Sequence, residues 1–348
     1  PTRLDPYASL RLPEFRYWLG AAAFATLASR ALAVALGFQI YELSQDPLAL
    51  GILGLVEAIP AIGLALFGGH AADRYDRRSI VLITRGVSVL AALAFAFLSL
   101  NLQAYGLAAL YAVVFVAGIA RGFADPANSA FEAQVIPRQL YVNASTWSGT
   151  MWQATSIVGP TVGGFAYAFL GVTNTYILIA ILFALALGCM SLIKKKPMPP
   201  PEQGESIWTS LTLGVRYVFR SQIFVGSMAL DLFAVLFGGA IALLPIFASD
   251  ILQVGPQGLG LLVAAPSVGA LLSMLWATRH PPTKNSGKIF LAVVAGFGVA
   301  MIVFALSRDF YLSMFALAMS GMFDGVSVVI RETILRLYSP EALRGRVA

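Results

Sequence analysis

The sequence alternates between long apolar segments and short polar ones. Each apolar segment is about twenty residues long, which is the length that an α-helix needs to cross the hydrocarbon core of a bilayer. Ten such segments follow one another, at residues 17–41, 48–69, 80–101, 104–125, 146–169, 174–193, 222–249, 257–277, 288–306 and 310–335. Most are joined by hairpin-like connections, so the pattern predicts an all-α membrane protein with ten spans.

Composition agrees with this pattern and excludes several classes of protein. Of the 348 residues, 58% are hydrophobic and only 11% are charged, whereas about 25% are charged in an average soluble domain. No stretch is left for a soluble enzyme domain, and neither a nucleophile–base constellation nor a phosphate-binding G-x-x-x-x-G-K-[ST] motif occurs. The single cysteine and the two histidines have no partners at ligand spacing. We therefore expect no enzyme activity, no cofactor and no metal.

The net charge of +6 is explained by membrane topology. If the turn at residues 69–78 is cytoplasmic, alternation of the spans leaves only Arg308, of 23 Lys and Arg residues, in an outer loop. This is the positive-inside rule, and it predicts a multi-pass protein of a bacterial-type plasma (inner) membrane with both termini in the cytoplasm. The basic residues therefore do not indicate a nucleic-acid partner, and we read the first segment as a true span rather than a signal peptide.

The turn between the second and third segments is rich in charge. It carries the pattern G-x-x-x-D-R-x-x-R-R, formed by Gly69, Asp73, Arg74, Arg77 and Arg78. This resembles the loop between helices 2 and 3 of the major facilitator superfamily, whose usual form is G-x-L-A-D-R-x-G-R-R. Asp76 replaces the second Gly, a variant that resembles the drug and siderophore efflux branch that includes the enterobactin exporters. The resemblance implies that these residues form a cytoplasmic gate, although they also fit a simple topological anchor.

The fifth segment contains G-P-x-x-G-G, formed by Gly159, Pro160, Gly163 and Gly164. Small residues at this density let a neighbouring helix approach closely, and the proline provides a point at which the helix can bend. The string is similar to the fifth-helix antiporter motif of the same superfamily, which is associated with exporters rather than importers.

The two halves of the chain repeat each other. At an offset of 203, Gly118 and Gly122 fall on Gly321 and Gly325, and at 206 Pro60 falls on Pro266. Parallel repeats of this kind relate the two halves of the major facilitator fold. We expect an N-terminal six-helix bundle at 1–193, a cytoplasmic linker with an amphipathic helix at 194–220, and a C-terminal bundle at 221–348. The resemblance implies twelve spans, of which the last two are missing here.

Several ionisable residues fall inside the predicted spans, where a charge costs about 2.5–3.5 kcal/mol and is tolerated mainly beside a partner or a cavity. In the first half they are Arg30, Glu57, Arg121 and Asp125, and in the second half they are Asp231, Asp324 and Arg331. We expect them to line a cavity for protons or substrate. Further candidates for this cavity are Trp152 and Gln153.

Two ion pairs follow from spacing. Arg30 and Glu57 lie at similar depths in the first and second spans, which predicts a pair between them. Arg121 and Asp125 are four residues apart and share one face of the fourth helix, which Pro126 is expected to break. Each pair fits either a proton switch or a static contact that fixes helix packing, and both interpretations stay open.

The resemblance implies a monomeric secondary transporter that works by alternating access. We expect a proton-coupled exporter (antiporter) of a small-molecule substrate, of amphipathic character. The alternative is a proton-independent facilitator or importer of lipids or metabolites. A receptor or channel without alternating access is a third class, but it predicts neither the internal repeat nor the kinked Gly-Pro helix. Membrane lipids are the other expected partners, because Lys194, Lys195 and Lys196 could meet anionic headgroups.

Overall fold

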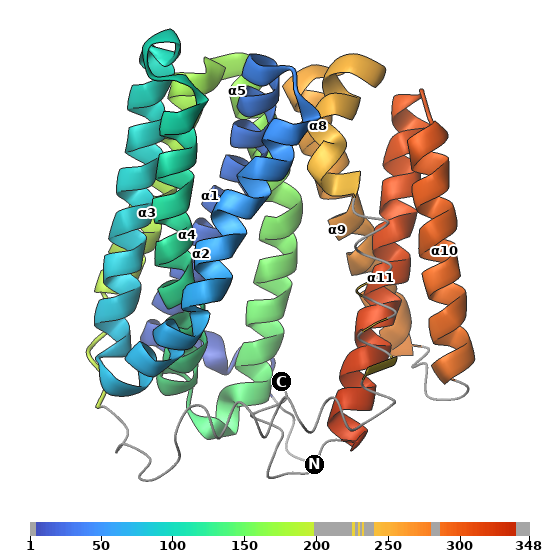
Figure 1. Cartoon of the computed structure of the whole chain (residues 1–348). Coiled ribbons are helices and arrows are strands. Elements are labelled where there is room, and N and C mark those ends of the chain that lie inside the picture. Colours follow the sequence, from blue (N-terminus) through green and yellow to red (C-terminus); the bar gives the residue numbers. More distant parts are fainter. Residues whose placement is uncertain are drawn as a thin grey trace. The chain divides into compact units, whose positions relative to one another are not determined.

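The computed structural model describes residues 5–197, 240–279 and 286–338, together with a few positions between 225 and 232. The expected amphipathic helix in the linker and Asp231 lie outside the described residues. Within the described parts the regular elements are helices (Figure 1). The long ones are α1 (Pro13–Ser44), α2 (Pro47–Arg74), α3 (Arg77–Leu100), α4 (Leu102–Val135), α5 (Tyr141–Ser191), α9 (Gly255–Arg279), α10 (Ser286–Leu306) and α11 (Phe310–Tyr338). The short ones are η1 (Ser9–Arg11), η2 (Arg138–Leu140), η3 (Ala240–Leu243), α8 (Leu244–Ile246) and the π-helix η4 (Phe247–Ile251).

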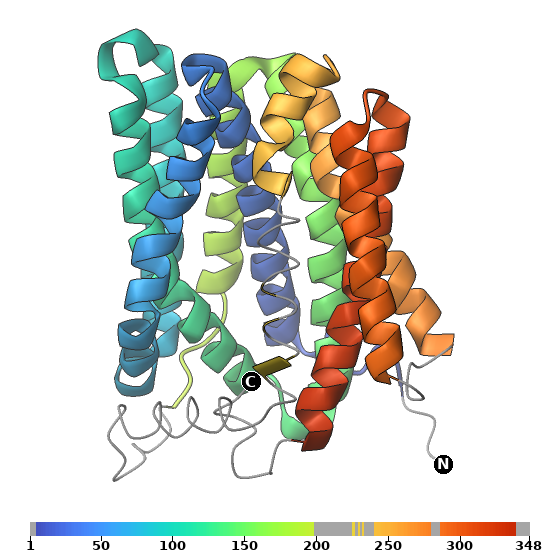
Figure 2. The ribbon, with the colours of Figure 1, turned by 45° about the vertical axis from the view of Figure 1, so that its right-hand side comes forward.

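Eight helices among the described residues are long and apolar enough to cross a membrane. The helix α5 contains two of the predicted spans, since Gly171 has a left-handed φ of 78° that no helical residue adopts. The chain reverses direction between the two parts, as Figure 2 shows. The predicted segment 222–249 lies mostly outside the described residues, and the other nine coincide with helical segments. The all-α fold expected from the sequence is therefore confirmed.

One predicted helix boundary is wrong. The fourth span was expected to end near residue 125, with a break at Pro126, but α4 continues through Pro126 to Val135. A proline removes one backbone hydrogen bond, and in a membrane helix neighbouring groups can compensate for that loss. As a result, α4 carries polar residues beyond Pro126 on the same helix as Arg121.

The chain separates into two compact units. Unit 1 comprises Pro1–Pro201 and Pro245–Ala264, and unit 2 comprises Glu202–Leu244 and Ala265–Ala348. Within unit 1, α1 packs mainly against α5, α2 packs against α4, and α3 contacts both α4 and α5. The larger core cluster of this unit includes the fully buried side chains of Ile40, Phe95, Leu110 and Tyr176.

Glycines allow the closest helix contacts in unit 1. A Cβ atom on Gly163 would lie 2.6 Å from the carbonyl oxygen of Ala31, and one on Gly164 would lie 2.3 Å from that of Pro256. Both distances are too short for a real side chain, so α1 and the start of α9 approach the α5 backbone directly. The glycine motif of α5 is thus a packing surface, and its role in bending the helix stays a prediction.

The contact between α2 and α4 also depends on glycine. A Cβ on Gly118 would lie 2.8 Å from Cγ of Pro60, and one on Gly122 would lie 3.1 Å from Cβ of Leu64. The proline of α2 therefore sits against a flat, side-chain-free strip of α4.

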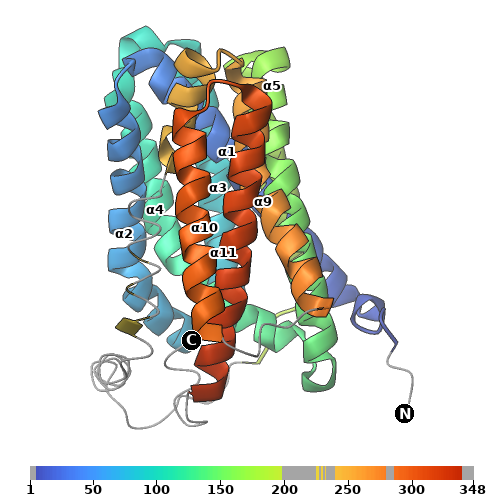
Figure 3. The same ribbon diagram turned by 90° about the vertical axis from the view of Figure 1, so that its right-hand side faces the viewer.

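Unit 2 repeats this contact between α9 and α11. A Cβ on Gly321 would lie 1.9 Å from the carbonyl oxygen of Pro266, and one on Gly325 would lie 3.2 Å from Cα of Ala270. In the sequence repeat, Gly321 and Gly325 correspond to Gly118 and Gly122 at the offset of 203. Pro266 and Ala270 correspond to Pro60 and Leu64 at the offset of 206. In the same unit α10 and α11 run side by side (Figure 3). The pseudo-symmetry predicted from sequence is therefore visible as the same helix contact made twice.

These contacts predict the effect of a methyl group. Gly163→Ala is expected to destabilise the protein by about 1–3 kcal/mol, because overpacking forces α1 and α5 apart. The matched control is Gly188→Ala in the second part of α5, where an added Cβ has nothing within 4 Å. Thermal unfolding of the purified variants compares the two. Equal melting temperatures for the two variants would contradict the packing role of Gly163.

Candidate functional site

An ion network joins α2 and α4 in unit 1. Arg121 Nη1 lies 2.6 Å from Glu57 Oε1, and Arg121 Nε lies 3.5 Å from Asp125 Oδ2. The second contact is the one expected from the four-residue spacing. The exposed fraction of the side chain is 58% for Arg121, 46% for Glu57 and 70% for Asp125. The charges are therefore paired with one another but are not sealed inside packed helices.

The predicted pair of Arg30 and Glu57 is wrong. The Arg30 guanidinium instead lies over the Trp152 ring of α5, 5.7 Å from its centroid. The physical reason is helix pairing, because α1 packs on α5 while α2 packs on α4, so Glu57 faces Arg121. Position along a helix does not fix the direction in which a side chain points, because that direction depends on which helices pack together.

Arg30 is held in position by a glycine. A Cβ on Gly159 would lie 2.6 Å from Cβ of Arg30, so the arginine stem lies directly on the α5 backbone. Trp152 is 51% exposed. The cation and the aromatic ring thus form one exposed feature on neighbouring helices, of a kind worth about 0.5–1 kcal/mol at exposed sites.

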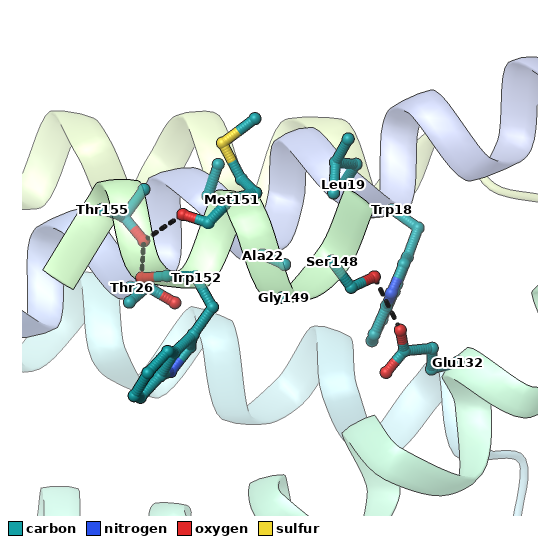
Figure 4. Close-up of a pocket in the computed structure, with 11 residues that line it drawn as sticks. Trp18, Leu19, Ala22, Thr26, Glu132, Ser148, Gly149, Met151, Trp152 and Thr155 are labelled. Carbon is teal, nitrogen blue, oxygen red and sulfur yellow. Dashed lines mark hydrogen bonds between the residues drawn. The ribbon is translucent and has the colours of Figure 1, made fainter. Parts of the chain in front are cut away.

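A pocket of about 300 Å³ adjoins this feature (Figure 4). It lies between α1, α4 and α5, within unit 1. Two tryptophans, several small or apolar residues and four polar residues form its walls. They are Trp18, Leu19, Ala22, Ala23, Thr26, Glu132, Ser148, Gly149, Met151, Trp152 and Thr155. The volume is at the lower end of the range for small-molecule sites.

Glu132 is a residue of this pocket that sequence reasoning missed. Its Oε1 accepts a hydrogen bond of 2.8 Å from Ser148 Oγ. The fourth span was expected to end at residue 125, so Glu132 was not counted among the intramembrane charges. A signal was present, since Glu132 lies seven residues after Asp125 and a helix of 3.6 residues per turn places both on one face.

Trp152 and Gln153 were both predicted to line a cavity. Trp152 does line the pocket. Gln153 is only 4% exposed and is not among the lining residues. Adjacent residues on a helix point about 100° apart, so one of the two faces the pocket while the other is turned into the bundle.

Unit 2 contains a second charged pair on α11. Arg331 Nη2 lies 3.8 Å from Asp324 Oδ1, with side chains that are 25% and 47% exposed. In the repeat register Asp324 corresponds to Arg121 and Arg331 to Asn128. The acid and the base therefore occur in reversed order in the two units. Asp231, the remaining candidate of this half, lies outside the described residues.

Two arginines of the basic turn at residues 69–78 bind backbone carbonyl oxygens near the ends of other helices. Arg77 donates hydrogen bonds to the carbonyl oxygens of Ala72 (2.9 Å) and Ala130 (3.2 Å), which links α2 to α4. Arg78 donates to the carbonyl oxygens of Ser191 (2.8 Å) and Ile193 (2.6 Å), at the end of α5.

The remaining residues of the turn are more open. Asp73 is 76% exposed and lies 3.7 Å from Arg77, Arg74 is exposed, and Gly69 has open space around its Cα. Arg77 and Arg78 therefore serve as anchors that hold helix ends together, whereas Asp73 and Arg74 project from the turn. The gate role of this turn stays a prediction.

Comparison with curated proteins finds exporters. The enterobactin exporter EntS of Escherichia coli O1:K1 / APEC is 27% identical over 338 residues, which is 96% of this chain and 80% of the relative. EntS of Shigella boydii serotype 18 matches to the same extent.

Solved structures share the fold at low sequence identity. A POT family transporter has a TM-score of 0.73 at 13% identity, covering 96% of this chain and 85% of that one. A bacterial homologue of the iron transporter ferroportin in an inward-facing state has a TM-score of 0.68 at 17% identity, covering 97% and 86%. The sequence model of the Major Facilitator Superfamily matches residues 18–348. The chain therefore belongs to the major facilitator superfamily and is a multi-pass secondary transporter.

Proposed function

We propose that this protein is a proton-coupled exporter of small amphipathic compounds, working by alternating access in a bacterial inner membrane. The observation that carries the proposal is the open network of Glu57, Arg121 and Asp125 in unit 1. The similarity to an enterobactin exporter over 96% of the chain supports export as the direction of transport.

The network has the chemistry that proton exchange requires. A carboxylate beside an arginine is stabilised in its ionised form, and an acid that loses this partner in surroundings of low dielectric takes up a proton more readily. Arg121 lies between two acids, so a small shift of α2 relative to α4 would free Glu57 while Asp125 keeps its partner. A purely static ion pair would not need a second acid or an exposed geometry.

Asp324 and Arg331 supply the corresponding pair in unit 2. Ionisable groups at membrane depth are expensive and are usually functional. We infer that Asp324 and Glu57 are the groups that exchange protons, with Asp125 and Asp231 in supporting roles. The turn around Asp73 and Arg74 would act as a gate at the cytoplasmic side, where both ends of the chain would also lie.

The second candidate is a facilitator or importer that needs no proton. The same fold supports it, because fold alone does not fix direction or coupling. The exposed acid–arginine network favours the proton-coupled exporter over this alternative.

Transport driven by a pH gradient separates the two candidates. In proteoliposomes with an acidic interior, an exporter that exchanges protons for substrate is expected to accumulate ethidium, whose charge does not change with pH. One-for-one exchange limits the accumulation to about tenfold per pH unit. A protonophore is expected to release the dye. If ethidium equilibrates to the same extent with and without the pH gradient, the result would support the facilitator. If the protein causes no movement of ethidium at all, cationic dyes of this kind would be excluded as substrates.

Asp324→Asn tests the proton role directly. Asparagine keeps the size of the side chain but cannot bind and release a proton, so pH-driven accumulation is expected to fall by at least about tenfold, as for loss of a group that transfers protons. Asp309→Asn is the matched control, since Asp309 accepts a hydrogen bond from the Leu312 backbone N–H at the start of α11 and asparagine can replace it there. Full pH-driven transport by Asp324→Asn would refute the assignment.

A further inference from the structure

The pocket between α1, α4 and α5 has one charged group. Of its lining residues, all of which the structure describes, Glu132 alone is ionisable. No cation pairs with it among the described residues, and the hydrogen bond from Ser148 occupies only one of its two oxygens. A carboxylate without a counter-ion, in a pocket lined mainly by apolar and small groups, attracts a cationic ligand by its charge.

Two tryptophans bound the space in which such a ligand would lie. Figure 4 shows Trp152 and Trp18 toward opposite ends of the pocket, with Ala22 and Gly149 between them. Trp18 is almost fully buried and packs edge-on against Phe131, so its ring is fixed. Indole rings accept flat apolar groups, and the small residues leave room between them.

Charge is distributed unevenly along the pocket. Arg30 lies over the Trp152 ring at one end, while Glu132 and Ser148 lie near Trp18. The positive end repels a cationic group and the negative end attracts it, so a bound molecule would be oriented. The hydroxyl group of Thr155 already donates to the carbonyl oxygens of Met151 and Trp152, and of the four polar lining residues Glu132 alone is charged.

We propose that this pocket binds aromatic organic cations, with the ammonium group at Glu132 and the ring system between Trp18 and Trp152. Ser148 acts as a positioning residue that holds the carboxylate toward the pocket. That the bound molecule is also transported rests on the proposed function, whereas the binding can be measured without any transport.

Three dansyl probes of matched shape test the charge preference. Dansyl-ethylenediamine carries an ammonium group, dansylamide is neutral, and dansylglycine carries a carboxylate. Binding to the purified protein in lipid nanodiscs is followed by energy transfer from tryptophan, with empty nanodiscs subtracted. The protein is expected to bind the ammonium probe about ten- to a hundredfold more tightly than the carboxylate probe. Equal affinity for the three probes would overturn the proposal.

Glu132→Gln removes the charge but leaves an oxygen that accepts the hydrogen bond from Ser148. It is expected to weaken binding of the ammonium probe by about tenfold or more while the neutral probe binds as before. Glu42→Gln is the matched control on α1, where the side chain accepts a hydrogen bond from Tyr167 and does not line the pocket. Unchanged binding of the ammonium probe by Glu132→Gln would overturn the proposal.

If Glu132→Gln no longer binds any of the three probes, a second variant is needed to separate loss of the charge from loss of the folded pocket. Glu132→Asp keeps the charge, so it is expected to prefer the ammonium probe over the neutral one, and loss of that preference would refute the site. If the protein transports substrate but does not bind the probes, the proposed cation pocket is refuted and the proposed export function stands. If the protein binds the probes but transports nothing, the proposed export function is refuted and the proposed cation pocket stands.

Discussion

The packing of unit 1 depends on one constraint, which is that an arginine placed at membrane depth needs a partner. Arg121 meets this need with two acids, Glu57 on α2 and Asp125 on its own helix. Arg30 lies over the aromatic ring of Trp152. The helices that carry these groups are therefore held at fixed rotations as well as at fixed distances, because turning either helix would separate a charge from its partner.

Glycine makes this arrangement possible. Lipid tails are as apolar as leucine, so helices in a membrane associate by close packing rather than by removing apolar surface from water. Gly118 and Gly122 bring α4 onto α2, and Gly159 and Gly163 bring α5 onto α1. The same glycines thus place the ion network and Arg30 beside backbone that carries no side chain. The glycine–proline contact recurs in unit 2, where Asp324 and Arg331 lie on the equivalent helix.

The proposed sites lie along one face of α4. Arg121, Asp125 and Glu132 share this face, and Glu132 lies about two turns beyond Asp125, so a proposed proton site and a proposed cation pocket lie along the same side of one helix. Gly122, next to Arg121, contacts α2. A movement of α2 against α4 would therefore affect the ion network first, and the pocket between α1, α4 and α5 only through α4.

The sequence by itself determined the class of fold, the positions of the helices and the internal repeat, because hydrophobic length and glycine spacing are properties of the chain. It also identified most of the intramembrane charges, and the i,i+4 pair of Arg121 and Asp125 needed only helix geometry. What the tertiary structure alone decided is which helices meet. The partner of Glu57, the position of Arg30 over Trp152 and the pocket around Glu132 all depend on the pairing of α2 with α4 and of α1 with α5. A one-dimensional pattern gives the depth of a side chain but not its direction, and that direction is set by the packing of neighbouring helices.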